Sequence, residues 1–396
     1  MSERDTARPL RLAIVRQRYN PFGGAERFVE RALQALSGSG LDVTLIARKW
    51  DGPANDHFHL RKCRPPYLGR LSRDKGFAEQ VRQIIQRNEF DIVQSHERIA
   101  GCEVFRAGDG VHATWLAQRL RTLTPWQRFL QKHSPWHAYT LAAEDAMFRD
   151  VRLRAVICNS HMVRDDIARR YPDISHKLHV IHNGVDLARF SPDLRATHRD
   201  AVRAALGVGH RTPVVVYVGS GFARKGVAQL IDALQKPALA QAELWIIGKD
   251  RDAQGMQARA KAGGLSFRVR FLGPQKDVAP YLGAADAFAL PTLYDPMPNA
   301  ALEALACGLP VLTSPMSGAA ELIKPGFGAV VDALDIDGIA RELARLLALA
   351  VDPAQRDLVC DAARHAIANM GSEDMATRQL ALYRLLLAEA ATRSPL

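Results

Sequence analysis

Two carboxylates in one stretch of the chain have the chemistry to bind a sugar. Asp295 stands in a turn-rich loop, and Glu303 follows eight positions later, about one turn into a run that favours helix. A carboxylate accepts two hydrogen bonds at once, and neighbouring sugar hydroxyls donate them at a matching separation. The same pattern also fits a turn former and an ordinary helix residue near a favourable dipole end, so spacing alone leaves both interpretations open.

Two adjacent cations, Arg224 and Lys225, have the chemistry to bind a diphosphate. They follow an apolar strand-like run and precede a helix that we expect to begin near Gly226. Arginine offers a planar fork and lysine a compact charge, and the amides of a helix N-terminus would add to both. Exposed Arg-Lys pairs are common, so the dipeptide alone indicates little.

The elements that must position these residues alternate between strands and helices, which is typical of parallel α/β sheets. Strands are expected at residues 10–15, 42–47, 91–94, 103–107, 155–158, 213–218, 244–247, 269–272, 287–290 and 310–313. Helices are expected at 24–36, 77–87 and 299–307, and from 337 onward. For the helix at 299–307 we expect Asn299 as the N-cap and Gly308 as the C′ residue. Ligands of such sheets bind at the carboxyl ends of the strands.

Other residues at expected strand ends are further candidates. Gly23 and Gly24 lack a Cβ, so their amides can approach a phosphate or sugar, although a simple turn needs the same residues. Asp109 and His112 follow an expected strand, but Asp109 stands between two glycines and fits a turn equally well. Asn183 precedes a glycine, and a tight turn is a sufficient explanation there.

Length and charge limit the class of protein. The chain has 396 residues, which is too long for one ordinary domain and suits two. The net charge of +11 favours acidic partners, such as nucleic acid, anionic lipid or phosphorylated substrates. The five cysteines form no C-x-x-C pair, which indicates a reducing compartment without structural zinc. Without a signal core or a run of roughly 18 apolar residues, we expect a cytoplasmic protein that does not cross a membrane.

The stretch at 111–143 is the most unusual in composition. It has no Asp or Glu and contains four cations and three of the five tryptophans, namely Arg119, Arg121, Arg128, Lys132, Trp115, Trp126 and Trp136. Interfacial helices combine such cations with aromatic residues at the level of the lipid headgroups. Trp and Arg are also common in buried packing and in RNA binding, so composition alone leaves the three uses open.

The stretch PTLYDPMPNAALEALACGLPVLTSP at 291–315 resembles the donor-site motif of the retaining family 4 glycosyltransferases, which have the GT-B fold. That motif reads E-x7-E and continues to G-x-P-V. Asp295 stands in place of the first glutamate, and the rest is kept as Glu303, Gly308, Pro310 and Val311.

Other segments extend the resemblance over most of the chain. GSGFARKG is similar to the family's G-R-x-x-x-x-K-G cluster, with the arginine moved next to the lysine. YNPFGGAERF resembles the first loop of the lipopolysaccharide core glucosyltransferase I branch, which reads Y-F-P-F-G-G. The family's I-x-N-G-V-D pattern occurs at the crossing between domains, which places the boundary near Val185.

The resemblance implies two Rossmann-like, doubly wound domains facing a cleft. They would be an acceptor domain at 9–185 and a nucleotide-sugar domain at 186–374, with a last helix at 375–392 packing back on the first. Catalytic roles are implied for Asp109, Arg224, Lys225 and Asp295. The donor would be held by Gly23, Gly24, Arg224, Lys225, Asp295, Asn299, Ala300 and Glu303. Weaker candidates are His112, Asn183, Gly318 and Glu321.

The implied reaction moves a hexose, glucose in the branch named above, from a UDP-sugar to a heptose of the lipopolysaccharide inner core with retention. No cofactor or metal is implied, because Arg224 and Lys225 would stabilise the leaving diphosphate. Since the family's acceptor is a lipid of the inner leaflet, a peripheral contact with the cytoplasmic face of the inner membrane is implied. Its residues would be Trp115, Arg119, Arg121, Trp126, Arg128 and Lys132.

Other functions stay open at this point. The chain could be a family 4 enzyme that acts on another glycan or lipid and uses another donor, namely UDP-N-acetylglucosamine, UDP-galactose or GDP-mannose. It could also be a GT-B sugar nucleotide epimerase, which would need no lipid acceptor. A basic nucleic-acid-binding protein would bind RNA or DNA with steep salt dependence and would not be stabilised by UDP-sugars. No sequence motif of a nucleic-acid-binding fold supports that last alternative.

Overall fold

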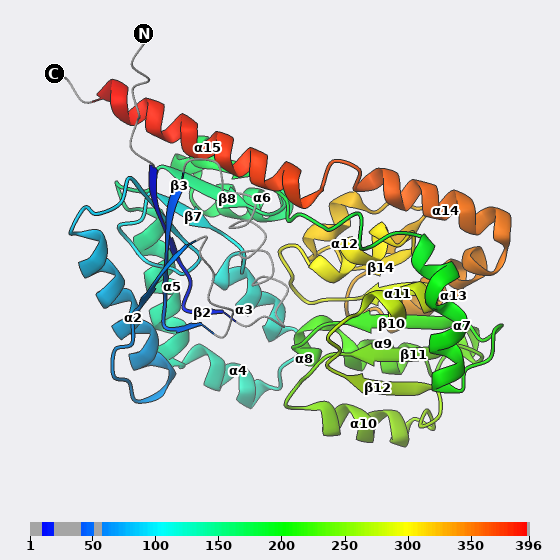
Figure 1. Ribbon diagram of the computed structural model, residues 1–396. Coiled ribbons are helices and arrows are strands. Elements are labelled where there is room, and N and C mark those ends of the chain that lie inside the picture. The colour runs from blue at the N-terminus through cyan, green and yellow to red at the C-terminus, as the bar shows by residue number, and fades with distance from the viewer. Residues whose placement is uncertain (1–9, 20–40, 51–57, 394–396) are drawn as a thin grey trace, which may run out of the picture. The chain divides into compact units, whose positions relative to one another are not determined.

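The chain forms two compact units, each a parallel sheet covered by helices (Figure 1). The computed structural model describes residues 10–19, 41–50 and 58–393. The first unit comprises Met1–His182 and Ser372–Leu396, and the second comprises Asn183–Gly371. Gly23, Gly24 and the helix expected at 24–36 lie outside the described residues.

The last helix belongs to the first unit. This helix, α15 (Ser372–Arg393), packs on the first sheet through Leu382, Tyr383 and Leu386. The sequence placed the domain boundaries near 185 and 374, whereas the units divide after His182 and after Gly371.

The first sheet has seven strands, and every neighbouring pair is parallel. Its order is β5 (His59–Lys62), β3 (Leu41–Ala47), β1 (Leu10–Val15), β6 (Ile92–Ser95), β7 (Val104–Arg106), β8 (Ala155–Cys158) and β9 (Leu178–Val180). A separate parallel pair is formed by β2 (Arg18–Tyr19) and β4 (Lys49–Trp50). The chain builds outward from β1 to one side and then to the other, so the order reverses between β1 and β6, where doubly wound sheets bind ligands.

Helices cover both faces of this sheet because alternate strand residues point to opposite sides. Leu12 and Ile14 of β1 pack in the cluster that contains α15, whereas Ala13 and Val15 pack in the cluster that contains α2. The helices are α2 (Gly69–Ile85), α3 (His112–Leu120), α4 (Pro125–Lys132), α5 (Pro135–Phe148), α6 (His161–Arg170) and the 3-10 helix η1 (Pro172–Lys177).

The second sheet has six parallel strands in the order of a Rossmann fold. They are β12 (Val269–Gly273), β11 (Glu243–Ile247), β10 (Val214–Val218), β13 (Ala287–Leu290), β14 (Val311–Thr313) and β15 (Gly328–Val330). The order reverses between β10 and β13. Both central strands are almost entirely buried and apolar, as expected for parallel strands covered on both faces.

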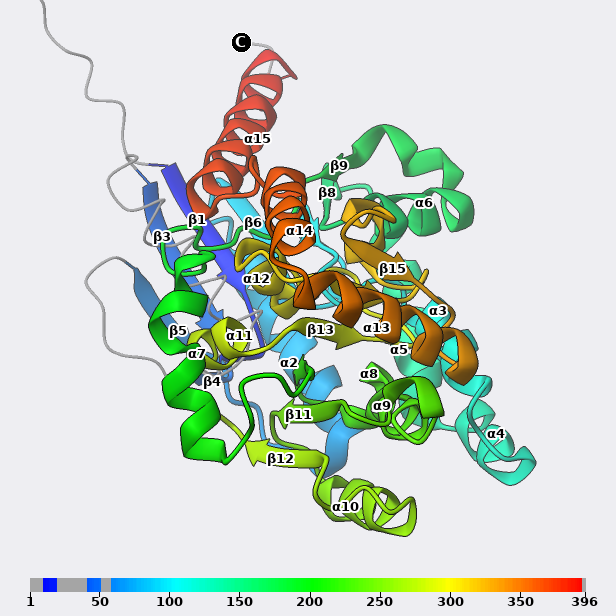
Figure 2. The same ribbon diagram turned by 90° about the vertical axis from the view of Figure 1, so that its right-hand side faces the viewer.

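The helices of the second unit pack against this sheet and one another, as Figure 2 shows for α12 and α13. They are α7 (Asp193–Leu206), α8 (Phe222–Lys225), α9 (Val227–Ala233), η2 (Pro237–Leu239), α10 (Ala253–Ala262), α11 (Ala279–Ala284), α12 (Asn299–Ala306), η3 (Gly318–Leu322), α13 (Ile336–Val351) and α14 (Pro353–Ala366).

The expected strands agree with the observed ones to within one residue at each end. The sequence missed β2, β4, β5, β9 and β15, which are edge strands too short or too polar to give an apolar run. It also placed the start of α2 at residue 77, whereas the helix begins at Gly69. Residues 69–76 are mostly polar and include two glycines, so they carry no helical pattern.

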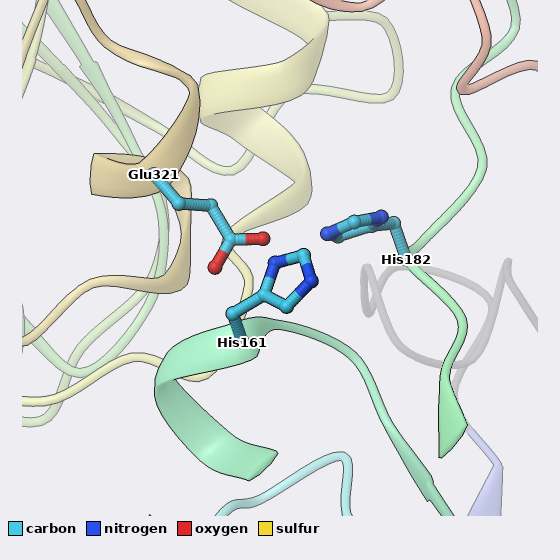
Figure 3. A group of neighbouring side chains, drawn as sticks. All are labelled: His161, His182 and Glu321. Atoms are coloured by element: carbon cyan, nitrogen blue, oxygen red, sulfur yellow. The ribbon is translucent and has the colours of Figure 1, made fainter. Parts of the chain in front are cut away.

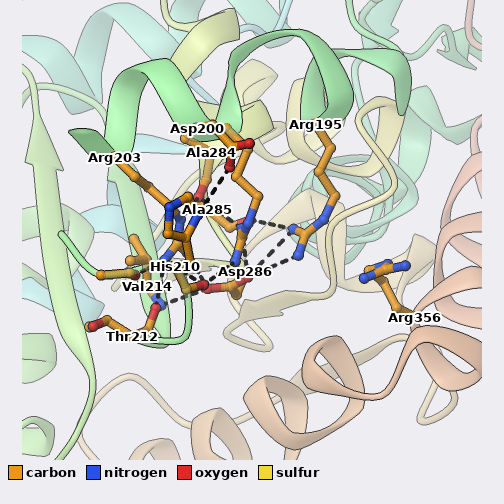
Figure 4. A network of polar contacts seen from close by, with 12 residues as sticks. Arg195, Asp200, Arg203, His210, Thr212, Val214, Ala284, Ala285, Asp286 and Arg356 are labelled. Carbon is orange, nitrogen blue, oxygen red and sulfur yellow. Dashed lines mark hydrogen bonds and ion pairs between the residues drawn. The ribbon is translucent and has the colours of Figure 1, made fainter. Parts of the chain in front are cut away.

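A charged cluster ties α7 to the amino ends of β10 and β13 (Figure 4). Arg195, Arg199 and Arg203 follow one another at one-turn spacing and lie 3.4, 2.8 and 2.6 Å from the carboxylate of Asp286, just before β13. The same carboxylate accepts a hydrogen bond from the amide of Val214, the first residue of β10, at 3.0 Å. One aspartate therefore fixes a helix and two strands together.

Candidate functional site

Three charged side chains meet at the carboxyl ends of β10 and β13, where the strand order of the second unit reverses. Arg224 and Lys225 lie on α8, which follows β10, and Asp295 lies in the loop after β13. The Nζ of Lys225 is 3.0 Å from Oδ2 of Asp295, and Nη1 of Arg224 is 3.6 Å from the same oxygen. The structure thus brings together the cation pair and one of the two carboxylates that the sequence singled out.

Backbone contacts hold α8 against this loop. The carbonyl of Arg224 accepts a hydrogen bond from the Leu293 amide at 2.8 Å, and Nη1 of Arg224 donates to the Tyr294 carbonyl at 2.7 Å. Gly226, which follows α8, has a φ of +84°, and a Cβ there would lie 2.2 Å from the Pro291 carbonyl oxygen. Only glycine fits such a position, so this close approach fixes the cations beside the loop.

The helical turn that carries the two cations was not predicted. The helix expected near Gly226 is α9, but Arg224 and Lys225 already lie in α8, whose Phe222 amide donates to Oδ2 of Asp250 at 2.9 Å. Because α8 has four residues and α9 seven, neither sums many peptide dipoles. The positive charge of the site therefore comes chiefly from the two side chains.

Asp295 is ionised by its surroundings. The side chain is buried, which alone would raise the pKa, but the charges of Lys225 and Arg224 and the hydrogen bond from Lys225 hold the pKa of Asp295 below its usual value. A carboxylate with a lowered pKa is a weak base, so the site favours binding and orientation over proton removal.

The N-cap of α12, the helix that carries Glu303, lies one residue earlier than expected. Pro298, not Asn299, is the N-cap of α12, and Asn299 is its first helical residue. Asn183 donates from Nδ2 to Oδ1 of Asn299 at 2.7 Å and to the Met297 carbonyl at 3.1 Å, so it fixes the entry to the helix. The sequence could not show which of the two residues is the N-cap, because asparagine and proline are both common at the start of a helix.

The position of α12 and its C-terminal end are as the sequence predicted. Glu303 is buried on the second turn, with 7% of its surface exposed, and Ala300 is half-buried on the first turn. Gly308 follows the C-cap Cys307 with a φ of +74°, and the Leu309 amide donates to the Ala304 carbonyl at 3.0 Å, which closes the helix.

The loop after β14 is joined to Asp295 through the backbone. The Asp295 amide donates to the Met316 carbonyl at 3.0 Å, and the Gly318 amide donates to the Asp295 carbonyl at 2.9 Å. Gly318 is therefore part of the site's framework. Glu321, in the same 3-10 helix, is exposed.

In the first unit, Asp109 lies in an exposed turn between β7 and α3. That turn is held by two residues that the sequence did not indicate. Arg98 donates to the Gly110 carbonyl at 2.8 Å and pairs with the buried Glu144 at 2.7 Å. The Glu144 carboxylate also accepts from the His112 amide at 2.9 Å, so it caps α3. No local motif marks either residue, because the contact joins positions far apart in the sequence.

His112 and His137 form a buried pair of neutral imidazoles. Nε2 of His112 is 3.1 Å from Nδ1 of His137, and the His112 ring stacks on Trp115. Burial and then the charge of Arg98 lower the pKa of His112 to about 3. Burial and then the charge of Arg119 lower the pKa of His137 to about 4. His112 is thus a packed histidine whose protonation is opposed by its surroundings.

A second pair of histidines lies at the carboxyl end of β8 and beyond β9. The rings of His161 and His182 meet edge-on, with 5.6 Å between centroids and an angle of 64° (Figure 3). His161 opens α6, where the Ser160 hydroxyl accepts from the Val163 amide at 3.2 Å. The pair adds polar rings to the same edge of the first sheet as Asp109.

The stretch at 111–143 divides into a buried and an exposed part. Trp115, expected at a membrane, is only partly exposed and packs against His112, and Trp136 donates to Asp74 at 2.8 Å. The composition of the stretch did not show which face is packed. By contrast, Trp126 is 67% exposed. The exposed cations are Arg119, Arg121, Arg128 and Lys132.

The apolar side chains of α4 form one outward stripe at helical spacing. Trp126, Phe129 and Leu130 are 67%, 51% and 52% exposed, and the rings of Trp126 and Phe129 stack with 5.6 Å between centroids. Among the described residues, no helix has the length and apolar character needed to span a bilayer.

Comparisons with known proteins agree with this architecture. A model described as Glycosyltransferase Family 4 matches residues 22–189, and one described as Glycosyl transferases group 1 matches residues 212–349. The lipopolysaccharide core biosynthesis glycosyltransferase LpsE of Rhizobium meliloti (strain 1021) is 29% identical over 330 residues, covering 82% of this chain and 86% of its own.

An alpha-maltose-1-phosphate synthase of Mycobacterium tuberculosis (strain CDC 1551 / Oshkosh) is 30% identical over 288 residues, covering 69% of this chain and 72% of its own. The crystal structure of WaaG, a glycosyltransferase involved in lipopolysaccharide biosynthesis, matches with a TM-score of 0.80 at 22% identity, covering 93% of this chain and 98% of its own. The two units thus have the GT-B fold. The chain belongs to the group 1, family 4 glycosyltransferases.

Proposed function

We propose that this glycosyltransferase moves glucose from UDP-glucose to a heptose of the lipopolysaccharide inner core, with retention and without a metal. One observation carries the proposal: Arg224, Lys225 and Asp295 meet at the carboxyl ends of β10 and β13, the place where such sheets bind nucleotides. The similarity to LpsE over most of both chains supports the acceptor class. The motif resemblance to the glucosyltransferase I branch supports the donor.

The two cations would stabilise the leaving group. As the bond from the sugar to the diphosphate breaks, negative charge grows on the phosphate oxygens, and Arg224 and Lys225 are already held in place. This preorganised charge supports a reaction without a metal. The chain has two D-x-D sequences, a pattern that can bind a metal, at 250–252 and 335–337. Their first residues have structural uses, since Asp250 accepts a hydrogen bond from the Phe222 amide and Asp335 accepts one from the Gly338 amide.

Asp295 would orient the groups around it rather than remove a proton from the substrate. Its lowered pKa makes it a weak base, and its ion pair positions Lys225. In the mechanism that the family resemblance implies, the acceptor attacks from the leaving-group face, so no carboxylate needs to act as a nucleophile. Glu303 and Asp295 would then bind sugar hydroxyls.

The exposed face of α4 would contact the membrane. An apolar stripe of Trp126, Phe129 and Leu130 beside exposed cations suits the headgroup region of an anionic leaflet. Sedimentation with vesicles of phosphatidylglycerol and phosphatidylethanolamine should pellet the wild type, and the double variant Trp126→Ser, Phe129→Ser should stay in the supernatant. Equal pelleting of both proteins would contradict this contact.

A thermal-shift panel tests the donor. UDP-glucose, UDP-N-acetylglucosamine, UDP-galactose, GDP-mannose and ADP-heptose would each be added in the presence of EDTA. A ligand that binds only the folded state raises the melting temperature, so we expect a rise with UDP-glucose. A rise with a different donor alone would replace glucose in the proposal. No rise with any donor would overturn it.

A second candidate is transfer to a small sugar rather than to a lipid. The alpha-maltose-1-phosphate synthase of M. tuberculosis, whose name gives a sugar phosphate as product, is 30% identical to this chain over 288 residues, compared with 29% over 330 residues for LpsE. Radiolabelled transfer to lipopolysaccharide core and to glucose 1-phosphate, run side by side, separates the two candidates by which product carries the label.

A further inference from the structure

One buried hydroxyl beside Arg224 and Lys225 has no use in the fold. Tyr217, near the carboxyl end of β10, is 0% exposed, and its ring lies edge-on to Phe222 with 5.9 Å between centroids. No group among the described residues forms a hydrogen bond with the Tyr217 hydroxyl. A buried hydroxyl without a partner destabilises a fold, and phenylalanine would fill the same space without that penalty.

This hydroxyl faces the cation cluster. A Cβ placed on Gly219 would lie 3.3 Å from Oη of Tyr217 and 3.4 Å from Nζ of Lys225. Burial raises the pKa of Tyr217, and the nearby charge of Arg224 offsets only part of that rise. The hydroxyl therefore keeps its proton at neutral pH and can donate a hydrogen bond. A protonated donor and an ammonium therefore adjoin one small space.

We propose that Tyr217 is a further ligand of the donor diphosphate, its hydroxyl donating a hydrogen bond to a phosphate oxygen. Gly219 has no Cβ, which leaves this space open to the phosphate. The Lys225 side chain borders the same space while it is paired with Asp295, and on donor binding it would turn toward the phosphate and give the phosphate access to the hydroxyl. The assignment rests on the proposed donor site at Arg224 and Lys225.

A second tyrosine provides a matched control. Tyr383 on α15 is also 0% exposed, but its hydroxyl donates to Oε1 of Gln94 at 2.7 Å. It is therefore a tyrosine whose hydroxyl serves the fold. The two residues differ in the use of the hydroxyl and match in burial.

The experiment compares the full-length wild type with Tyr217→Phe and Tyr383→Phe, with EDTA present. We expect Tyr217→Phe to keep or raise the melting temperature of the free protein and to raise the dissociation constant of UDP about tenfold, the usual effect of losing a hydrogen bond to a charged group. Tyr383→Phe should lower the melting temperature by a few degrees and leave the dissociation constant unchanged.

The outcomes separate this inference from the proposed function. If the wild type binds UDP and Tyr217→Phe binds it equally well, the Tyr217 assignment is wrong and the donor site stands. A lower melting temperature in Tyr217→Phe with unchanged UDP affinity would make the hydroxyl a structural group that holds a buried water. If the wild type binds none of UDP, GDP and ADP, the donor site and the Tyr217 assignment both fall.

Discussion

Two charged clusters at opposite ends of the second sheet use similar side chains in different ways. At the amino ends, three arginines of α7 surround Asp286, and the buried Arg203 also donates to backbone carbonyls (Figure 4). At the carboxyl ends, the Asp295 carboxylate forms ion pairs with Arg224 and Lys225.

The clusters differ in how much of their hydrogen-bonding capacity is used. The side chain of Arg203 is 1% exposed, whereas that of Arg224 is 35% exposed. Among the described residues, the Arg224 side chain makes one hydrogen bond and one ion pair, and Lys225 makes one ion pair. The buried and extensively bonded Arg203 stabilises the fold, whereas the partly exposed Arg224 has donors left to bind an anion.

The largest expected effect is on stability at the amino ends. Asp286→Ala leaves three guanidinium groups without a counter-charge and removes the acceptor of the Val214 amide. Breaking a buried ion pair on one side costs about 3–5 kcal/mol, so we expect the free energy of unfolding to fall by about that amount. Urea denaturation measures it. A loss below about 1 kcal/mol would show that the cluster does not hold the fold.

The next effect is on activity at the carboxyl ends. Lys225→Ala removes a cation that would stabilise the leaving diphosphate, and loss of one such group lowers kcat by about 100-fold or more. Because Arg224 still pairs with Asp295, the melting temperature should change little. Steady-state kinetics and thermal denaturation measure the two quantities. Wild-type turnover in this variant would show that Lys225 does not stabilise the leaving group, and the carboxyl-end cluster would then have no demonstrated catalytic use.

The sequence predicted those features of the second unit that depend on residues close together in the chain. Apolar runs located the longer strands to within one residue at each end, and Gly308 marked the end of α12. The Asp286 cluster was not predicted, because Arg203 and Asp286 are 83 positions apart and nothing local marks their contact.

Within the candidate site, the sequence predicted residue types better than their contacts. Arg224, Lys225 and Asp295 were singled out by charge and by resemblance, but their ion pairs depend on the close packing of α8 on the next loop. Trp115 was assigned to a surface because composition does not show which side of a helix is packed. Tyr217 had no signal, since a tyrosine in a central strand is ordinary core.

A smaller effect concerns acid stability. Burial opposes the charge of Asp295, but Lys225 and Arg224 lower its pKa below the usual value, so its ion pairs stabilise the fold above about pH 4. That contribution is lost as the pH falls through the lowered pKa. Asp295→Asn removes the titration. Its melting temperature should therefore fall less steeply than that of the wild type below about pH 4, and parallel curves would contradict the ion pairing.

The smallest effect is expected at the margin of the amino-end cluster. Arg195 is the most exposed of the three arginines, at 27%, and lies 3.4 Å from Asp286. Partly exposed ion pairs contribute about 0–1 kcal/mol, so Arg195→Gln should lower the free energy of unfolding by less than about 1 kcal/mol. A much larger loss in urea denaturation would mean that the three arginines stabilise the fold as one unit.

The most direct test of the account is a calorimetric titration of UDP, with EDTA, into the wild type, Arg224→Gln and Arg195→Gln. Both substitutions remove one positive charge from the second unit, but only Arg224 belongs to the carboxyl-end cluster. We expect Arg224→Gln to weaken UDP binding about tenfold or more, and Arg195→Gln to match the wild type. Equal weakening in both variants, or in neither, would contradict a diphosphate site at Arg224 and Lys225.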